Sequence, residues 1–145
     1  MAAELKERIR ADLNAARRER DRLRTELLTT TLSDIRNREI ELGHELSDEE
    51  TIEVLSRAIK RRQEAAEQMR AGKREELAEK EEREAALLSA YLPPPLDEAE
   101  VRALVREAIA GGAKSIGEVM GLIMPRIKGR FDGREANRIV REELG

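Results

Sequence analysis

Three consecutive prolines at residues 93–95 constrain the fold of this chain more than any other feature of its sequence. A helix cannot continue through such a run, and each proline also biases the residue before it away from helical backbone angles. On both sides of the run, apolar residues recur at spacings of three and four, which is typical of amphipathic helices. The prolines therefore predict a boundary between two helical parts.

The composition also favours helices. Of the 145 residues, 41% are charged and 1% are aromatic, whereas ordinary globular domains contain about 25% charged residues. β-Branched and aromatic strand formers are too scarce for a sheet. We therefore expect an all-α fold with a four-helix N-terminal domain (1–92), a proline hinge (93–96) and a three-helix C-terminal module (97–145).

Capping residues predict where the helices begin and end. The expected ends lie at residues 18–21, Gly43, Ala71-Gly72, Gly111-Gly112 and Gly129. The expected N-caps are Asp21, Ser47, Asp97, Ser115 and Asp132, and in the last four a glutamate follows three residues later. Pro125 falls inside an expected helix, and because its ring removes a backbone hydrogen bond, we expect a kink near Met124.

Several classes of function are excluded or disfavoured. The chain has no cysteine and a single histidine, His44, so thiol chemistry and the common zinc sites are excluded. No phosphate-binding loop or dinucleotide fingerprint is present, and nothing marks any pair of carboxylates as an acid and a base. No apolar run is long enough to cross a membrane, and the charged N-terminus lacks a signal-peptide core. We therefore expect a soluble cytoplasmic protein with no catalytic residues, metal or cofactor of its own and no membrane partner.

The C-terminal part contains a local excess of positive charge. Residues 125–141 include six cationic and two anionic side chains. Arg134, Arg138 and Arg141 follow a spacing that places them on one helix face. Cations beside a helix N-terminus suit a phosphate group. This pattern predicts a nucleic-acid site that comprises Lys128, Gly129, Arg130, Gly133, Arg134 and Arg138. The alternative is a capped turn with a solvated basic face.

A second set of cations favours a different interpretation. It comprises Arg17, Arg18, Arg20, Arg22 and Arg24, with Lys60, Arg61 and Arg62 on another helix. Because Glu19 and Asp21 are interleaved with the arginines, we expect these side chains to form surface ion pairs.

The two aromatic residues limit the kind of nucleic-acid contact available. They are Tyr91, expected to pack beside the hinge, and Phe131. Without aromatic platforms for stacking, recognition of splayed single-stranded bases is not expected, and neither is readout of a DNA sequence. Binding through the phosphate backbone and the folded shape remains.

Several segments resemble one known family. They are residues 35–41, 46–50, 77–81 and 91–93, followed by Met120-Gly121, Met124-Pro125, Lys128-Gly129-Arg130 and Asp132-Gly133. Together they resemble the GatB/YqeY family over nearly the whole chain, and the length and order are similar to those of stand-alone YqeY-like proteins.

The resemblance implies a link to tRNA. The family shares its helical parts with the B subunit of the tRNA-dependent amidotransferase, which amidates Glu-tRNA(Gln) or Asp-tRNA(Asn) with ammonia from glutamine and activation by ATP. In that enzyme the tail module contacts the elbow of tRNA, and the cradle for ATP and metal lies in a separate region with no counterpart here. The resemblance thus transfers the helical and tail modules without the amidotransfer chemistry.

Three hypotheses follow from the sequence. The first is a non-catalytic module that binds RNA, above all tRNA. The second is an assembly factor whose charged helices dock a protein such as an amidotransferase subunit or a synthetase. The third is carbon–nitrogen ligase activity with glutamine as amido-N-donor, which rests on homology only and predicts turnover of glutamine and ATP.

Overall fold

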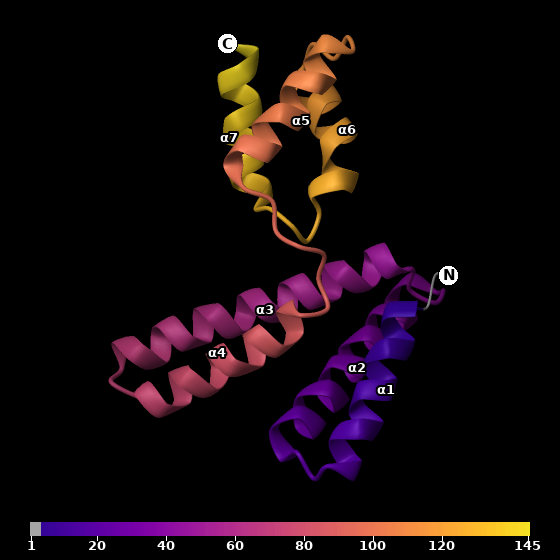
Figure 1. Ribbon diagram of the computed structural model, residues 1–145, viewed down its shortest axis with the longest axis vertical. Helices are drawn as coiled ribbons and strands as arrows, with labels where there is room; N and C mark the ends of the chain where they lie inside the picture. The colour runs from indigo at the N-terminus through magenta and orange to yellow at the C-terminus, as the bar shows by residue number, and fades with distance from the viewer. Residues whose placement is uncertain (1–3) are drawn as a thin grey trace. The chain divides into compact units, whose positions relative to one another are not determined.

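The fold is all-helical, as the sequence predicts. A computed structural model describes residues 4–145, and this part of the chain forms seven α-helices and no strand (Figure 1). The helices are α1 (Glu4–Arg18), α2 (Arg22–Leu42), α3 (Asp48–Ala71), α4 (Glu75–Ser89), α5 (Glu98–Ala110), α6 (Ile116–Ile127) and α7 (Gly133–Leu144).

The chain divides into two compact units. The N-terminal unit extends to Leu92, and the C-terminal unit comprises Pro93–Gly145. Each unit has its own hydrophobic core, and the two cores share no residue. Each set of helices therefore buries its apolar stripes within its own unit.

In the N-terminal unit, α1 lies alongside α2, and α3 lies alongside α4 (Figure 1). The apolar residues that recur at helical spacing in the sequence form the core of this unit. Its largest fully buried side chains are Ile9, Leu28, Ile35, Leu46, Leu55 and Leu88.

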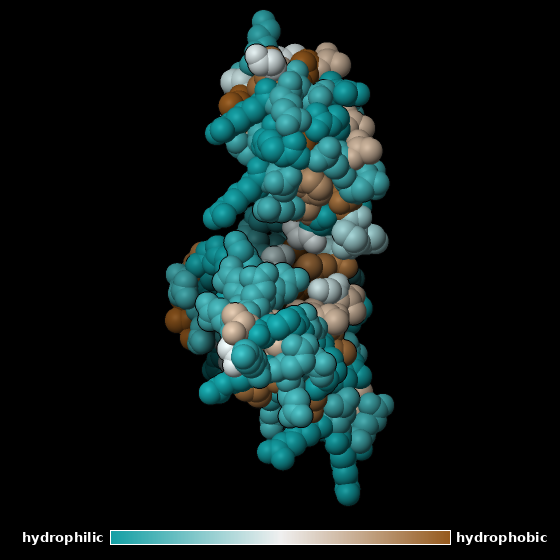
Figure 2. Space-filling view, turned by 90° about the vertical axis from the view of Figure 1, so that its left-hand side faces the viewer, coloured by the Kyte–Doolittle hydropathy of each residue, from teal (hydrophilic) through white to brown (hydrophobic). Residues whose placement is uncertain are grey.

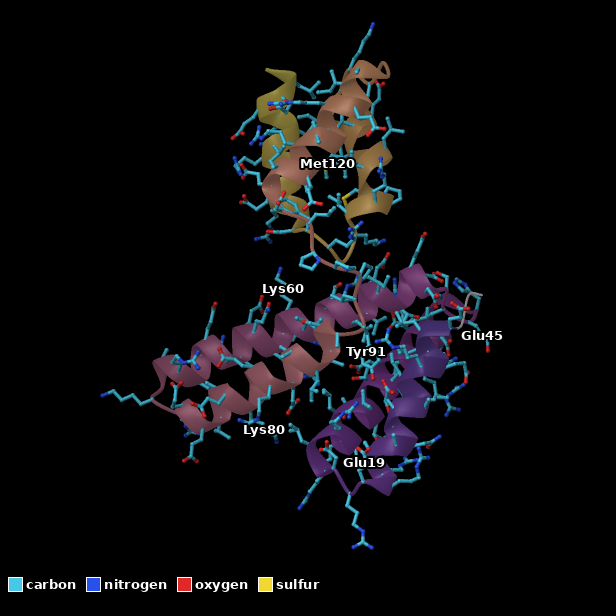
Figure 3. The ribbon with its side chains drawn as sticks, in the orientation of Figure 1. Glu19, Glu45, Lys60, Lys80, Tyr91 and Met120 are labelled. Atoms are coloured by element: carbon cyan, nitrogen blue, oxygen red, sulfur yellow. The ribbon has the colours of Figure 1, made fainter. Side chains whose placement is uncertain are left out.

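Tyr91 connects the end of α4 to α1 (Figure 3). Its hydroxyl donates a hydrogen bond to the Asp12 carboxylate, and the Arg8 guanidinium lies 4.9 Å from the centre of its ring. Burial, together with the Asp12 carboxylate, raises the pKa of the Tyr91 hydroxyl above its ordinary value. The tyrosine is therefore a neutral packing residue at neutral pH.

In the C-terminal unit, α5, α6 and α7 all contact one another. Val101, Val105, Val119, Ile123, Ile127 and Ile139 are its largest fully buried side chains. The proline segment is tied to this unit, because the Leu96 N–H donates to the Arg130 carbonyl oxygen at 2.8 Å. That bond holds the chain just before α5 against the turn between α6 and α7.

Most of the predicted caps form as expected. The Asp21 side chain accepts a hydrogen bond from the Arg24 N–H, and Gly43 adopts a left-handed φ of +78° after α2. Ser47 with Glu50 and Asp97 with Glu100 form reciprocal capping boxes. These local signals place the helix ends because they satisfy backbone groups that the helix itself leaves unpaired.

Three ends differ from the expectation. Before α6 the Ser115 side chain accepts from the Glu118 N–H, but the reciprocal bond of a capping box does not form. After α3 the left-handed residue is Lys73, at φ +61°, while Gly72 has a φ of −86°. At α7 the Asp132 carboxylate accepts from the Arg134 N–H, and the Glu135 side chain bonds to Arg138, so no reciprocal box forms there. α6 continues through Pro125 as a single helix to Ile127.

Candidate nucleic-acid interface

The turn between α6 and α7 carries the first three predicted site residues, Lys128, Gly129 and Arg130. Gly129 adopts a φ of +74°, a left-handed conformation that favours glycine. The N–H groups of Arg130 and Phe131 both donate to the Ile127 carbonyl oxygen, at 2.8 and 3.0 Å. These bonds fix the turn.

The Arg130 side chain is turned toward the proline segment. Its Nε donates to the Pro94 carbonyl oxygen at 2.8 Å, and its Nη1 lies 3.4 Å from the Arg126 carbonyl oxygen. Both contacts are to the backbone of the same unit. The structure therefore gives Arg130 a role in holding the chain before α5, which sequence spacing did not suggest.

The N-terminus of α7 already has an anion at its cap. The Asp132 carboxylate accepts a hydrogen bond from the Arg134 N–H at 3.1 Å, so one backbone donor that a phosphate could use is occupied. A Cβ added to Gly133 would meet nothing within 4 Å, so no close approach requires a glycine there. Phosphate binding at this end of α7 would depend on side chains.

Two arginines of α7 offer such side chains. Arg134 and Arg141 are both exposed. Within residues 4–145, neither guanidinium group has an ion pair or a hydrogen bond. Lys128 lies half-buried on the turn that precedes this helix. Arg134 and Arg141 thus keep positive charges that no carboxylate compensates.

Arg138, on the same helix, is in a different situation. Its guanidinium donates to Glu98 at 2.7 Å, Glu135 at 3.0 Å and Glu142 at 2.6 Å. Hydrogen bonds from Arg138 and then Arg102 hold the pKa of the Glu98 carboxyl group below its usual value. Hydrogen bonds from Arg102 and then Arg138 do the same for the pKa of Glu142. The Glu98 and Glu142 carboxylates therefore stay ionised at neutral pH, and a phosphate would have to displace them from Arg138.

A network of charges surrounds Arg138 and joins α5 to α7. Arg102 donates to Glu98, Glu142 and Glu143, and Arg106 donates to Glu143. The spacing along α7 predicted that Arg138 shares a face with Arg134, but it could not show which residues of α5 lie opposite that face.

The arginines at the turn between α1 and α2 do not pair as expected. They are Arg17, Arg18, Arg20, Arg22 and Arg24, and we call them the basic tip. Arg22 forms an ion pair with Glu26 at 3.0 Å, and the other four have no ion-pair partner in the described part of the chain. The expectation of ion pairing is therefore wrong for four of the five.

At the other cationic cluster ion pairing is confirmed for Arg61 and Arg62, whereas Lys60 has no ion-pair partner in the described part of the chain. Arg62 contacts Glu84 at 3.1 Å with both side chains largely buried, and Arg61 lies 3.5 Å from Asp34. Only the structure shows which cations form ion pairs, because Glu84 and Asp34 belong to neighbouring helices and are distant from these arginines in the sequence.

The described residues offer little for metal ligation or for spanning a membrane. Among residues 4–145, no group of three histidine, cysteine or acidic side chains is arranged to hold a metal ion. His44 is exposed and contacts the Glu50 carboxylate at 3.0 Å. None of the described helices is both long and apolar enough to span a lipid bilayer.

Comparisons with known proteins give one family and one relative. The family model described as "Yqey-like protein" matches residues 6–144. A protein of Pyrenophora tritici-repentis (strain Pt-1C-BFP), "Altered inheritance of mitochondria protein 41, mitochondrial", is 30% identical over 144 residues, which cover 95% of this chain and 80% of that protein.

Proposed function

The chain belongs to the family of YqeY-like proteins, and on this premise we propose that it is a non-catalytic module that binds RNA, above all tRNA. Recognition would use the phosphate backbone and the folded shape of the RNA, because the sequence contains a single tyrosine, a single phenylalanine and no tryptophan on which bases could stack. The observation that carries the proposal is the exposed, uncompensated charge of Arg134 and Arg141.

The contrast within the C-terminal unit supports this proposal. Arg102, Arg106 and Arg138 are held by carboxylates, and Arg130 is held by backbone carbonyls. Charges without partners add self-repulsion to the fold, whereas a polyanion that binds them releases its counterions and gains affinity.

The six predicted residues would then have different roles. Lys128 and Arg134, with Arg141, would contact phosphates, and Gly129 would hold the turn between them in its left-handed conformation. Gly133 would leave the start of α7 open. Arg130 and Arg138 would position these groups by fastening the proline segment and α5.

The basic tip offers a further phosphate-binding surface in the N-terminal unit. Arg17, Arg18 and Arg20 are exposed there without ion-pair partners in the described chain. The positive charge of these three side chains is not matched by a carboxylate among residues 4–145, which suits a polyanionic partner.

Binding of purified tRNA measured at rising salt concentration tests the proposal. We expect Lys128→Glu combined with Arg134→Glu to weaken binding at least tenfold at low salt, and to reduce the slope of log affinity against log salt by about one for each lost contact. Arg83→Glu is the matched control, since Arg83 is an exposed arginine of α4 with no ion-pair partner among residues 4–145. The absence of tRNA binding at low salt, or equal affinity of the double variant and the control, would contradict the proposal.

A second candidate function is that of an assembly factor that docks a protein such as an amidotransferase subunit or a synthetase. The observation that favours it is that α6 exposes two large apolar side chains, Leu122 (59% exposed) and Ile116 (37% exposed). Capture of one defined protein after nuclease treatment, lost in Leu122→Asp, would support this function over RNA binding. We propose no ligase activity for the chain alone. The expected compartment is the cytoplasm, although the fungal relative is named as a mitochondrial protein.

A further inference from the structure

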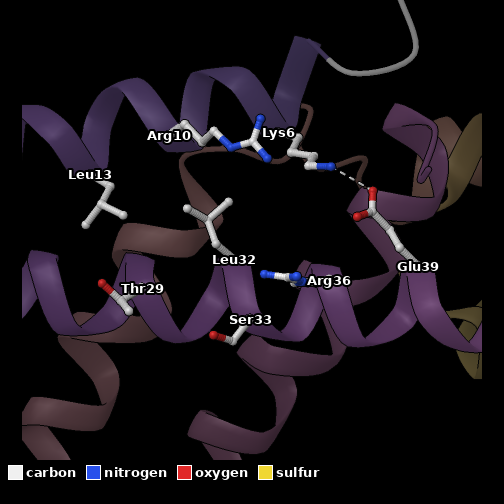
Figure 4. Close-up of a pocket in the computed structure, with 8 residues that line it drawn as sticks. All are labelled: Lys6, Arg10, Leu13, Thr29, Leu32, Ser33, Arg36 and Glu39. Carbon is white, nitrogen blue, oxygen red and sulfur yellow. Dashed lines mark hydrogen bonds and ion pairs between the residues drawn. The ribbon is translucent and has the colours of Figure 1, made fainter.

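A groove between α1 and α2 has a charge opposite to that of the chain as a whole (Figure 4). Its volume is about 350 Å³, which is within the range of small-molecule sites. The lining includes Lys6, Arg10 and Arg36 as cations and Glu39 as the one carboxylate. The lining thus has an excess of two positive charges in a chain whose net charge is −3.

One end of the groove is closed by a buried ion pair. The Lys6 ammonium donates to the Glu39 carboxylate at 2.8 Å, and the two side chains are 9% and 16% exposed. The Leu46 N–H donates to the same carboxylate at 3.0 Å. The hydrogen bond from Lys6 holds the pKa of Glu39 below its usual value, so Glu39 stays ionised and neutralises Lys6. The excess positive charge therefore belongs to the two arginines.

Arg10 and Arg36 reach the groove from opposite helices (Figure 4). Arg36 is exposed and has no ion-pair or hydrogen-bond partner within residues 4–145. Arg10 uses Nη1 to contact Glu7 at 2.6 Å, which leaves its other guanidinium nitrogens available. Two guanidinium groups on facing walls repel each other when empty and can share an oxyanion through charge-assisted hydrogen bonds.

The rest of the lining combines hydroxyl groups with apolar side chains. The Thr29 hydroxyl donates to the Thr25 carbonyl oxygen at 2.7 Å and can therefore only accept from a ligand. Ser33 is exposed without a hydrogen bond in the described chain and can donate one. Leu13 and Leu32 line the groove as apolar surface. The groove thus presents cationic donors beside an apolar wall.

We propose that this groove binds a small organic oxyanion, either a phosphate ester or a carboxylate, that carries a short apolar group. Arg10 and Arg36 hold the oxyanion, Ser33 donates a hydrogen bond to it, and Leu13 and Leu32 contact the apolar group. This inference goes beyond the RNA-binding proposal, because it rests on none of the residues proposed to contact RNA.

Titration of the full chain, followed by the backbone amide resonances of α1 and α2, tests the inference. The probes are phenyl phosphate, benzoate and inorganic phosphate. We expect at least one aromatic oxyanion to bind saturably and at least tenfold more tightly than inorganic phosphate, because only the organic probes also contact Leu13 and Leu32. Equal affinity for inorganic phosphate and both organic probes, or no saturable binding, would overturn the inference.

Variants of the arginines locate the binding site. Arg36→Ala should lower the affinity for the organic probe that binds more tightly by at least tenfold. Arg36→Lys should recover part of that affinity, because it restores the positive charge. Arg18→Ala is the matched control, because Arg18 is an exposed arginine of α1 that has no ion-pair partner in the described chain and does not line the groove. If Arg36→Ala and Arg18→Ala lose the same affinity for the probe, the binding reflects only the general positive charge of the surface, and the inference is overturned.

The same titrations identify the source of the oxyanion and separate the groove from the RNA proposal. Preference for phenyl phosphate assigns a phosphate ester, and preference for benzoate assigns a carboxylate. Arg36→Ala should bind tRNA as the unmodified chain does. If tRNA displaces phenyl phosphate and Arg36→Ala weakens tRNA tenfold, the groove is part of an RNA surface, which overturns the separate site and leaves the RNA proposal intact.

Discussion

The Arg130 Nε donates a hydrogen bond to the Pro94 carbonyl oxygen at 2.8 Å, although the two residues lie 36 positions apart. The Leu96 N–H returns a bond of 2.8 Å to the Arg130 carbonyl oxygen. One residue therefore binds the proline segment through its side chain and through its backbone. The prolines end the helix, and Arg130 fixes the position of the segment that follows them.

Replacing Arg130 with alanine should destabilise the C-terminal unit. The variant loses a charge-assisted hydrogen bond to a backbone carbonyl, a loss of about 1 kcal/mol in the free energy of unfolding. Denaturant unfolding, with hydrogen exchange at the Leu96 amide, measures the effect. Arg134→Ala is the control and should change stability by less than about 0.5 kcal/mol, because its exposed guanidinium contacts no carboxylate within the described residues. Equal stability of the two variants would show that the hydrogen bond from Arg130 to Pro94 does not stabilise the C-terminal unit.

The Lys6–Glu39 pair should make stability depend on acid. The pKa of Glu39 is lower in the folded chain than in the unfolded chain, where a glutamate has a pKa of about 4.3. The ionised Glu39 side chain therefore stabilises the fold fully at pH values above the pKa of the unfolded chain. That contribution is lost as the pH falls through the folded pKa. Glu39→Gln should cost about 1 kcal/mol at neutral pH and should flatten the decline in stability below about pH 4.

Urea unfolding at several pH values measures this dependence. Glu45→Gln is the control, since Glu45 is an exposed residue whose carboxylate has no ion-pair partner in the described part of the chain. If Glu39→Gln and Glu45→Gln show the same pH profile, the ion pair does not stabilise the fold.

The two cores should respond separately to truncation. Ile35 in the N-terminal unit and Ile139 in the C-terminal unit are both fully buried, and replacing either with alanine should cost about 2–5 kcal/mol. Because the cores share no residue, Ile35→Ala should reduce hydrogen-exchange protection in α1–α4, and Ile139→Ala should reduce it in α5–α7. Loss of protection throughout the chain in either variant would indicate a single cooperative unit.

Two glycines should respond to alanine with opposite signs. Gly43 has a φ of +78° and no atom near an added Cβ, so Gly43→Ala should lose about 1 kcal/mol through backbone strain alone. Gly121 lies inside α6 with equal space around it, so Gly121→Ala should gain about 0.5–1 kcal/mol of stability. Thermal unfolding measures both, and destabilisation by Gly121→Ala would indicate that Pro125 requires a glycine four residues before it.

Helix positions were largely predictable, because their signals are local. Asp21, Ser47 and Asp97 cap the helices that follow them, as the sequence indicates. The exception after α3, where Lys73 takes the left-handed conformation next to Gly72, shows that a glycine near a helix end need not be the residue that adopts it. A neighbour can do so at a modest energetic cost.

The candidate site was predictable only in part. The spacing of Arg134, Arg138 and Arg141 correctly places them on one helix, but Arg138 is occupied by carboxylates and the other two are not. Charge counts along the chain could not separate them.

The sequence alone determined the all-helical fold of the described residues, 4–145, and the approximate ends of the helices. Each of these features depends on residues within a few positions of one another, through capping bonds, apolar spacing and proline sterics. The tertiary structure decided which cations remain available for a partner. Arg138 meets Glu98 across 40 residues, and Arg10 and Arg36 line one groove from two helices. Such encounters depend on how helices pack, which the local pattern of a single helix does not specify.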